Sequence, residues 1–323
     1  MHVFITGGTG FFGKALLRYW SSGDKHPLED ARLTILSRDP TRFCSAHGEL
    51  LAKLNVSMIK GDIQNPSTLP TDDYTHILHA ATDSTIGLSL TPLQRFDQIV
   101  EGTRNVLDLA LRCDNPRVLV TSSGGVYGDI SQFTHGVPED YNGIPDPLSP
   151  HNAYSIAKRQ AEHLCTLYGH SFGLEFVIAR CFTFFGEDLP LGAHFAIGNF
   201  VRDALAGEDI VILGNGMPVR SYMDQRDLAR WLSTLLIRGQ AGRAYNVGSE
   251  NAISIADLAH RIANIAPGRR PNVRILKRMT EGQAAHRDVY LPDVSRAREE
   301  MDLQSEFHLD EMIHHAMARL MRS

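Results

Sequence analysis

The glycine-rich segment TGGTGFFG at residues 6–13 constrains the fold of this 323-residue chain more than any other feature. A short apolar run precedes it directly, and a stretch patterned as an amphipathic helix follows it directly. Gly8, Gly10 and Gly13 have the spacing G-x-G-x-x-G, which permits a tight turn and lets a phosphate approach the backbone. Unpaired N–H groups and the helix dipole then favour a pyrophosphate. Strand, turn and helix in this order predict a dinucleotide site, whereas a glycine motif alone would indicate an ordinary turn.

Short β-rich runs alternate with longer helical stretches in the first half of the chain. The runs are His2–Thr6, Leu33–Ser37, Val56–Lys60, Thr75–His79, Arg117–Thr121 and Glu175–Ala179. The helical stretches are Phe11–Ser22, Thr41–Leu54, Leu93–Arg112 and Asn152–His170. Because parallel neighbours require crossover connections, this alternation predicts an α/β fold with a doubly wound parallel (Rossmann) sheet and helices on both faces.

The alternation breaks after Cys181, where the Gly/Pro-rich segment GEDLPLGAH begins a less regular region. We expect residues 1–181 to form a dinucleotide-binding domain that includes the catalytic helix. Residues 182–323 are expected to form mainly a smaller substrate lobe, with segments that return to the main sheet. Expected elements of this region are helices Phe195–Ala206, Asp227–Ile237, Ser254–Ile265 and Leu309–Met321, and strands Ile210–Leu213 and Ala244–Val247.

Composition excludes several classes of protein. The chain has 32 basic and 37 acidic residues, a net charge of −5, which argues against nucleic-acid binding. No apolar run approaches the ~20 residues of a membrane span, and the N-terminus does not resemble a signal peptide. The four cysteines, Cys44, Cys113, Cys165 and Cys181, are too widely spaced to indicate a disulfide framework or a zinc site. We therefore expect a cytoplasmic protein without a metal.

The end of the second predicted strand bears on the choice of cofactor. An acid there bonds the ribose 2′-hydroxyl of NAD, whereas an arginine accommodates the 2′-phosphate of NADP. Ser37 and Arg38 occupy this place, and Asp39 follows one step later. The segment favours NADP over NAD, although Arg38 also suits a solvated position. Asp62, after the third strand, suits the adenine amino group or an ordinary turn.

Tyr154 and Lys158 are four residues apart in a predicted helix and therefore share one face. A phenol with a pKa of ~10 exchanges protons poorly at neutral pH unless a cation stabilises its phenolate. Ser123, in TSSGGVYG at a strand end, would complete the set, with Ser122 as the competing hydroxyl. Alone, a Tyr and Lys pair is common on exposed helices, but together with the glycine turn it predicts a catalytic site.

These motifs together resemble the extended short-chain dehydrogenase/reductase family, and within it the nucleotide-sugar epimerases, dehydratases and ketoreductases. TGGTGFFG is similar to the family's TGxxGxxG, with Gly7, Gly10 and Gly13 on its glycines. Further similar segments cover nearly the whole chain: HAAT from His79, GTRN from Gly102, PEDYNGIPDPLSPHNAYSIAK, GNGMPVRSYMDQRDLA, YNVGS and DVSRARE.

The resemblance implies roles for individual residues. Tyr154 would act as acid/base at sugar C4, Lys158 would bond the nicotinamide ribose and lower the Tyr154 pKa, and Ser123 would hold the same sugar oxygen. Implied cofactor contacts are Gly7, Gly10, Phe11, Phe12, Gly13, Ser37, Arg38, Asp62, Ile63, Ala80, Ala81, Tyr154 and Lys158. Implied substrate contacts are Ser84, Ser123, Thr183, Asn199, Arg220 and Arg278, with Arg287 as a rival to Arg278.

The resemblance also implies that Arg220 pairs with the substrate diphosphate, for which a guanidinium group is well suited, although Arg220 also suits an isolated surface position. The implied partner is thus a nucleotide-diphosphate sugar. The resemblance also implies a homodimer built from the Leu93–Arg112 and Asn152–His170 helices, although their apolar residues suit a sheet-facing core equally well.

Departures from the family pattern narrow the activity. The acid pair of 4,6-dehydratases is replaced by Gly124 and Gly125, while Thr183 and Phe185 stand for the family's Asn and Tyr. The glycine pair disfavours a 4,6-dehydratase. Because Ser37 and Arg38 favour NADPH, and NADPH drives reductions, we expect an NADPH-dependent reductase of a 4-keto, 6-deoxy sugar nucleotide, with a 4-epimerase as the close alternative. A non-catalytic dinucleotide-binding regulator is the alternative of another class, but a complete Ser, Tyr and Lys set argues against it.

Overall fold

The computed structural model describes residues 1–82, 90–192, 195–277 and 288–322. Its centre is a seven-stranded sheet in the order β11-β6-β5-β4-β1-β2-β3, in which every pair is parallel. The strands are β1 His2–Thr6, β2 Arg32–Ser37, β3 Val56–Lys60, β4 His76–His79, β5 Arg117–Ser123, β6 Phe176–Cys181 and β11 Arg243–Val247. This sheet confirms the predicted α/β fold.

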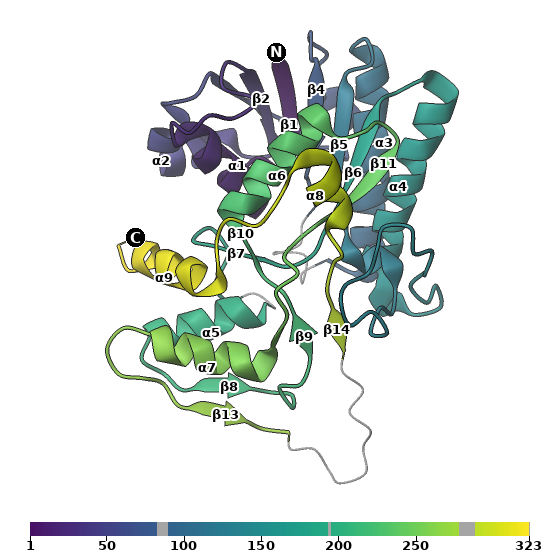
Figure 1. Ribbon diagram of the computed structural model, residues 1–323. Helices are drawn as coiled ribbons and strands as arrows, with labels where there is room; N and C mark the ends of the chain where they lie inside the picture. Colours follow the sequence, from purple (N-terminus) through teal and green to yellow (C-terminus); the bar gives the residue numbers. More distant parts are fainter. Residues whose placement is uncertain (83–89, 193–194, 278–287, 323) are drawn as a thin grey trace.

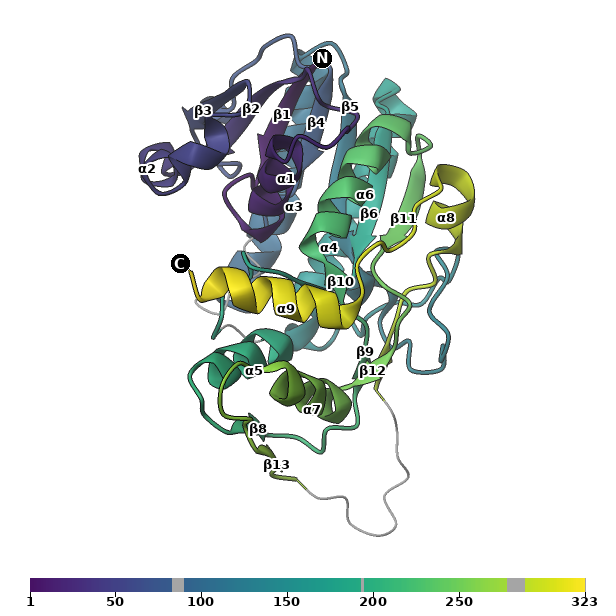
Figure 2. The same cartoon turned by 60° about the vertical axis from the view of Figure 1, so that its left-hand side comes forward.

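Helices cover both faces of the sheet, because successive strand residues point to opposite sides. On one face, Val3 and Ile5 share a core with α1 and α6, whereas Phe4 shares the opposite core with α3 and α4. Figures 1 and 2 show the two layers. The helices are α1 Phe11–Ser21, α2 Pro40–Leu51, α3 Pro92–Arg112, α4 Ala153–Phe172 and α6 Gln225–Arg238.

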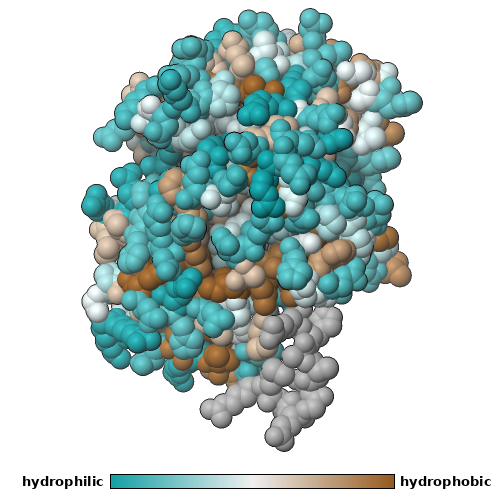
Figure 3. Space-filling view, viewed as in Figure 1, coloured by the Kyte–Doolittle hydropathy of each residue, from teal (hydrophilic) through white to brown (hydrophobic). Residues whose placement is uncertain are grey.

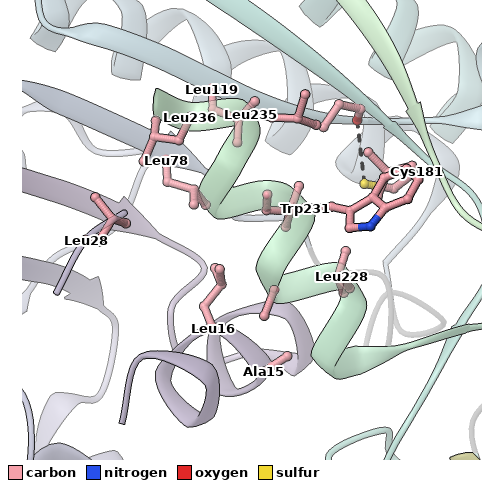
Figure 4. Close-up of a cluster of buried hydrophobic side chains, with 14 of the residues drawn as sticks. Ala15, Leu16, Leu28, Leu78, Leu119, Cys181, Leu228, Trp231, Leu235 and Leu236 are labelled. Atoms are coloured by element: carbon pink, nitrogen blue, oxygen red, sulfur yellow. Dashed lines mark hydrogen bonds between the residues drawn. The ribbon is translucent and has the colours of Figure 1, made fainter. Parts of the chain in front are cut away.

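Trp231 of α6 organises the first of these cores. It is fully buried, and Figure 4 shows it between Leu228 and Cys181, with Leu16 of α1 on the neighbouring helix. Burial of a large apolar side chain contributes about 1.5–3 kcal/mol, so α6 is held firmly against the sheet. The late chain therefore completes the core of the main sheet, as β11 completes its edge.

Local chemistry explains where the observed elements differ from the predicted ranges. The helix α2 starts at Pro40 because the Asp39 side chain accepts a hydrogen bond from the Arg42 N–H and caps it. The helix α4 ends after Phe172 because Gly173 takes a left-handed conformation at φ 70°. The strand β5 runs on to Ser123, so Ser122 and Ser123 belong to the strand itself.

A smaller lobe, formed mainly by the second half of the chain, lies beyond the carboxyl ends of the central strands (Figure 1). Its core joins α5 Ala196–Leu205, α7 Ile255–Ile265 and α9 Leu309–Leu320 with the parallel pair β8 Ile210–Ile212 and β13 Val273–Ile275. A second small sheet has the order β12-β9-β14, made of Ile253–Ser254, Val219–Arg220 and Val289–Tyr290.

Three short elements connect the lobe to the sheet: β7 Phe184–Phe185, which pairs with β10 Met223–Asp224, and α8 Ser295–Met301. Hydrophobic residues gather at the level of α5, where the lobe meets the rest of the molecule (Figure 3). The described helices include none that combines the length and apolar character needed to cross a bilayer.

Candidate active site

A cavity of about 1090 Å³ opens between the carboxyl ends of the central strands and the lobe. This is the position at which open α/β sheets bind ligands. Its lining includes the glycine turn, the ends of β2, β4, β5 and β6, one face of α4, and lobe residues such as Arg220 and Tyr222. Segments far apart in the sequence thus share one site.

The glycine turn forms one end of the cavity and fits a dinucleotide pyrophosphate. Gly7 has φ +76°, and a Cβ atom there would lie 2.5 Å from the Ala80 carbonyl. A Cβ atom on Gly13 would lie 2.2 Å from the Gly8 backbone, so glycine is required for the close packing of helix and turn. Gly10 caps α1 without a side-chain hydrogen bond, which leaves the N–H groups of the first turn to a ligand.

The adenosine end of the cavity contains four of the predicted cofactor residues: Ser37, Arg38, Asp62 and Ile63. Ser37 is buried and accepts a hydrogen bond from the Asp39 N–H. Because Asp39 caps α2, its carboxylate is already engaged away from a ribose. Phe11, Phe12, Ala80 and Ala81 line the cavity as well.

The catalytic candidates come together from β5 and α4. Lys158 is only 4% exposed, and its Nζ donates to Thr82 Oγ1 at 2.6 Å and to the Thr121 carbonyl at 2.8 Å. The Ser123 hydroxyl interacts with the Tyr154 phenol. Ser122, its competitor, also lines the cavity, but its hydroxyl donates to Glu162 Oε1 at 2.5 Å.

Burial shifts the pKa values of the two α4 groups in opposite directions. Burial raises the pKa of Tyr154 to about 12, against the hydrogen bond from Ser123. Burial lowers the pKa of Lys158 to about 8. The shift at Tyr154 is opposite to the lowering that we expected from Lys158, whose Nζ is bonded elsewhere and lies 6.0 Å from the Tyr154 ring centroid. At neutral pH the site therefore presents a neutral phenol and an ammonium.

Tyr290 is a second phenol at the same place and was not predicted from the sequence. Ser123 interacts with it, and burial raises its pKa. A Cβ atom on Gly124 would lie 2.6 Å from the Tyr290 hydroxyl and 2.7 Å from the Phe182 ring. These two aromatic side chains fill the space that a longer residue at position 124 would need. Tyr290 lies upstream of DVSRARE, and no spacing in the sequence connects it to the catalytic set.

The substrate candidates divide into three groups. Arg220 and Thr183 line the cavity, and Arg220 also donates to Asp288 Oδ2 at 2.6 Å. Asn199 lies outside the cavity lining, and its amide oxygen accepts a hydrogen bond from Arg202 on the next turn of α5. Ser84, Arg278 and Arg287 lie outside the described residues.

The charge of the lining favours an anionic ligand. Basic side chains outnumber acidic ones there, although the whole chain carries a net charge of −5. Such local enrichment attracts phosphate groups. The basic residues are Lys14, Arg38, Arg95, Lys158 and Arg220, and the acidic ones are Asp62 and Asp188.

Comparison with known proteins gives matches over nearly the full length. Residues 3–248 match the NAD dependent epimerase/dehydratase family. UDP-glucuronic acid decarboxylase 6 of Arabidopsis thaliana is 28% identical over 312 residues, which cover 96% of this chain and 86% of that protein. UDP-glucuronic acid 4-epimerase from Bacillus cereus in complex with NAD has a TM-score of 0.80 at 20% identity, covering 100% and 97% of the two chains. RMD from Pseudomonas aeruginosa complexed with NADPH has a TM-score of 0.77 at 21% identity, covering 100% and 99%.

Proposed function

The chain belongs to the NAD dependent epimerase/dehydratase family, and on that premise we propose that it moves a hydride between a nicotinamide cofactor and C4 of a nucleotide-linked sugar. The observation that carries the proposal is the meeting of Ser123, Tyr154 and Lys158 in a cavity whose far end is the glycine turn. A phenol, a hydroxyl and a buried ammonium that line one cavity with a glycine turn support this proposal.

The protein's own groups handle the proton and the position of the sugar. The cofactor, when bound, supplies or accepts the hydride. In the reducing direction the neutral Tyr154 phenol donates its proton to the oxygen at sugar C4. Ser123 hydrogen-bonds the same oxygen and also the phenolate that remains, while the Lys158 ammonium supplies a positive charge from the same face of α4.

Two observations favour net reduction of a 4-keto sugar by NADPH. Ser37 and Arg38 line the cavity at the ribose end, while Asp39 is engaged as the cap of α2. Burial raises the pKa of Tyr154 to about 12, so the phenol holds the proton that reduction of a ketone consumes. An oxidising first step would instead need the phenolate.

A nucleotide-sugar 4-epimerase is the second candidate, because the same three residues serve it and the Bacillus cereus neighbour is a 4-epimerase. A 4,6-dehydratase is less favoured. Gly124 and Gly125 supply no acid, and the Tyr290 hydroxyl and the Phe182 ring occupy the space beside Gly124.

The proposal is tested with purified protein, NADPH or NAD, and a panel of UDP-, dTDP-, GDP- and CDP-sugars. UDP-sugars come first because the decarboxylase and epimerase relatives are named for UDP-glucuronic acid. Stoichiometric loss of NADPH with a 4-keto sugar nucleotide supports the reductase, and interconversion without net cofactor loss supports the epimerase. Cofactor binding without turnover of any sugar would favour the non-catalytic regulator.

Homodimer formation through α3 and α4 is also proposed. The two helices pack against each other on one face of the sheet, and Leu167 of α4 is 45% exposed. Light scattering should give twice the chain mass of 35.8 kDa.

A further inference from the structure

The Lys158 ammonium has three hydrogens, and two of them have defined acceptors. One acceptor is the Thr121 carbonyl in β5, a backbone group fixed by the sheet. The other is the hydroxyl of Thr82, which follows Ala80 and Ala81 after the end of β4. Since Lys158 is 4% exposed, these two oxygens replace the water that would otherwise solvate its charge. Among the described residues no further acceptor takes the third hydrogen, and Lys158 lines the cavity.

Thr82 is well placed to act as this acceptor. Its own backbone N–H donates to the Ala80 carbonyl at 3.0 Å, which holds the residue in a tight turn at the end of β4. Its side chain lines the same cavity as Lys158. Of the two acceptors, Thr82 is the one that a substitution can remove, because Thr121 contributes a backbone oxygen.

We propose that Thr82 is a positioning residue whose hydroxyl oxygen orients the Lys158 ammonium toward the cavity and keeps this lysine charged at the pH of the reaction. The role in turnover rests on the proposed function, whereas the effect on the charge of Lys158 does not. The HAAT segment includes Thr82 but indicates no role for its hydroxyl. That hydroxyl becomes significant only when α4 lies across the ends of β4 and β5.

The groups around Lys158 are mostly uncharged, so the ammonium depends on neutral acceptors such as the Thr82 hydroxyl. Burial lowers the pKa of Lys158 to about 8, even though the Glu162 carboxylate acts in the opposite direction. Burial lowers the pKa of His79 to about 3, so this nearby imidazole is neutral at neutral pH. Burial raises the pKa of Cys181 to about 12 and keeps its thiol protonated. The titratable groups that face Lys158 are Tyr154, Glu162 and Cys165 from α4, His79 from β4, and Cys181 from β6.

Glu162 is the charged member of this set and is already engaged. It accepts hydrogen bonds from Arg180 and from Ser122. Removal of the Thr82 hydroxyl therefore changes the stabilisation of the ammonium without changing the charges around it.

The first test measures the charge of Lys158 in protein without cofactor. Carbon-13 labelling of the six lysines gives a titration curve for each, and Lys158→Met identifies the signal to follow. Loss of a hydrogen bond to a charged group disfavours the charged form, so Thr82→Val should lower the Lys158 pKa by about one unit or more. Thr82→Ser keeps the hydroxyl and should restore the wild-type curve.

The matched control is Thr234→Val, the same substitution in α6, where the hydroxyl bonds the Arg230 carbonyl away from the cavity. It should leave the Lys158 curve unchanged. An unchanged curve in Thr82→Val, with Thr82→Val and Thr82→Ser both unfolding at the wild-type temperature, would overturn the proposal. The proposal would also be overturned if Thr82→Ser lowered the Lys158 pKa as much as Thr82→Val does.

The second test follows turnover with pH. If the Lys158 pKa falls from about 8 to about 7, Thr82→Val should lose roughly eightfold in kcat at pH 8.5 but less than twofold at pH 6. A uniform loss at both values would contradict the proposed role. Because the titration needs no substrate, a shifted pKa without sugar turnover would refute the proposed function and leave the role of Thr82 intact.

Discussion

Tyr154 and Lys158 lie one helical turn apart, and burial raises the pKa of the phenol to about 12 while it lowers the pKa of the amine to about 8. Below about pH 8 the pair is a neutral proton donor next to a cation. Ser123, which ends β5, interacts with the same phenol. In the proposed mechanism these residues deliver one proton to one oxygen.

Replacing Tyr154 by Phe removes the proton donor and little of the ring's packing. We expect kcat to fall by roughly 100- to 10,000-fold, the usual contribution of a general acid, with cofactor affinity nearly unchanged. Steady-state kinetics and a fluorescence titration of the cofactor check the two parts. Turnover within threefold of wild type would exclude Tyr154 as the donor.

The alkaline limb of the pH profile should report Lys158. Because burial lowers its pKa to about 8, the lysine loses its charge as the pH rises through that value. The kcat of wild-type enzyme should therefore be constant from about pH 6 to 7.5 and decline above about 8. A profile that stays level up to pH 10 would argue against a role for the charged lysine.

Gly124 is where packing at the active site leaves no room for a side chain. Gly124→Ala places a methyl group against Tyr290 and Phe182, and overpacking of this kind costs about 1–3 kcal/mol. We expect a lower melting temperature and at least tenfold weaker turnover. Gly48→Ala in α2, where a Cβ atom meets no other heavy atom within 4 Å, is the matched control and should leave both quantities near wild type.

At the scale of elements, an ion cluster joins α1 to the segment that follows β7. Asp188 accepts hydrogen bonds from Arg18 at 2.6 and 3.1 Å and lies 3.4 Å from the Lys14 ammonium. Burial alone would raise its pKa, but the Arg18 hydrogen bond and the nearby positive charges outweigh this and hold the pKa below its usual value. The cluster holds α1, the helix that follows the glycine turn, against the segment after β7 that leads into the lobe.

The sign of the pH effect follows from this lowered pKa. The charged Asp188 stabilises the folded state above its unfolded pKa of about 3.9, and this stabilisation is lost as the pH falls through its folded value. Asp188→Asn should therefore cost about 2 kcal/mol of unfolding free energy at pH 7 and progressively less toward pH 3. Urea denaturation at several pH values measures the difference, and an equal cost at all of them would contradict the assignment.

The long elements were predictable from the sequence because their own periodicity determines them. The two- and three-residue strands β9, β12, β13 and β14 were not predicted, since so few residues carry no period and form strands only when distant segments pair. The active site divides in the same way. Ser123, Tyr154 and Lys158 follow from spacing and chain position, whereas Tyr290 and Thr82 reach the site only through tertiary folding.

At the scale of the whole molecule, the proposed cofactor and sugar nucleotide share one cavity between the sheet and the lobe. We expect NADP(H) to bind more tightly than NAD(H), because Arg38 lines the ribose end and Asp39 is engaged by α2. A ligand at 100 times its Kd stabilises the folded state by about 2.7 kcal/mol, so thermal unfolding should shift further with NADPH than with NADH at equal concentration. Equal shifts, or a larger shift with NADH, would contradict the prediction that Arg38 favours NADP(H).

The most direct measurement of the central claim follows the hydride itself. Wild-type enzyme is incubated with a 4-keto sugar nucleotide and NADPH that carries deuterium at the transferable C4 position, and the product is analysed by deuterium NMR. We expect the label at sugar C4 in the wild-type reaction and almost none at the same time point with Tyr154→Phe. Label at another sugar carbon, or NADPH oxidation without label in the sugar, would contradict the account.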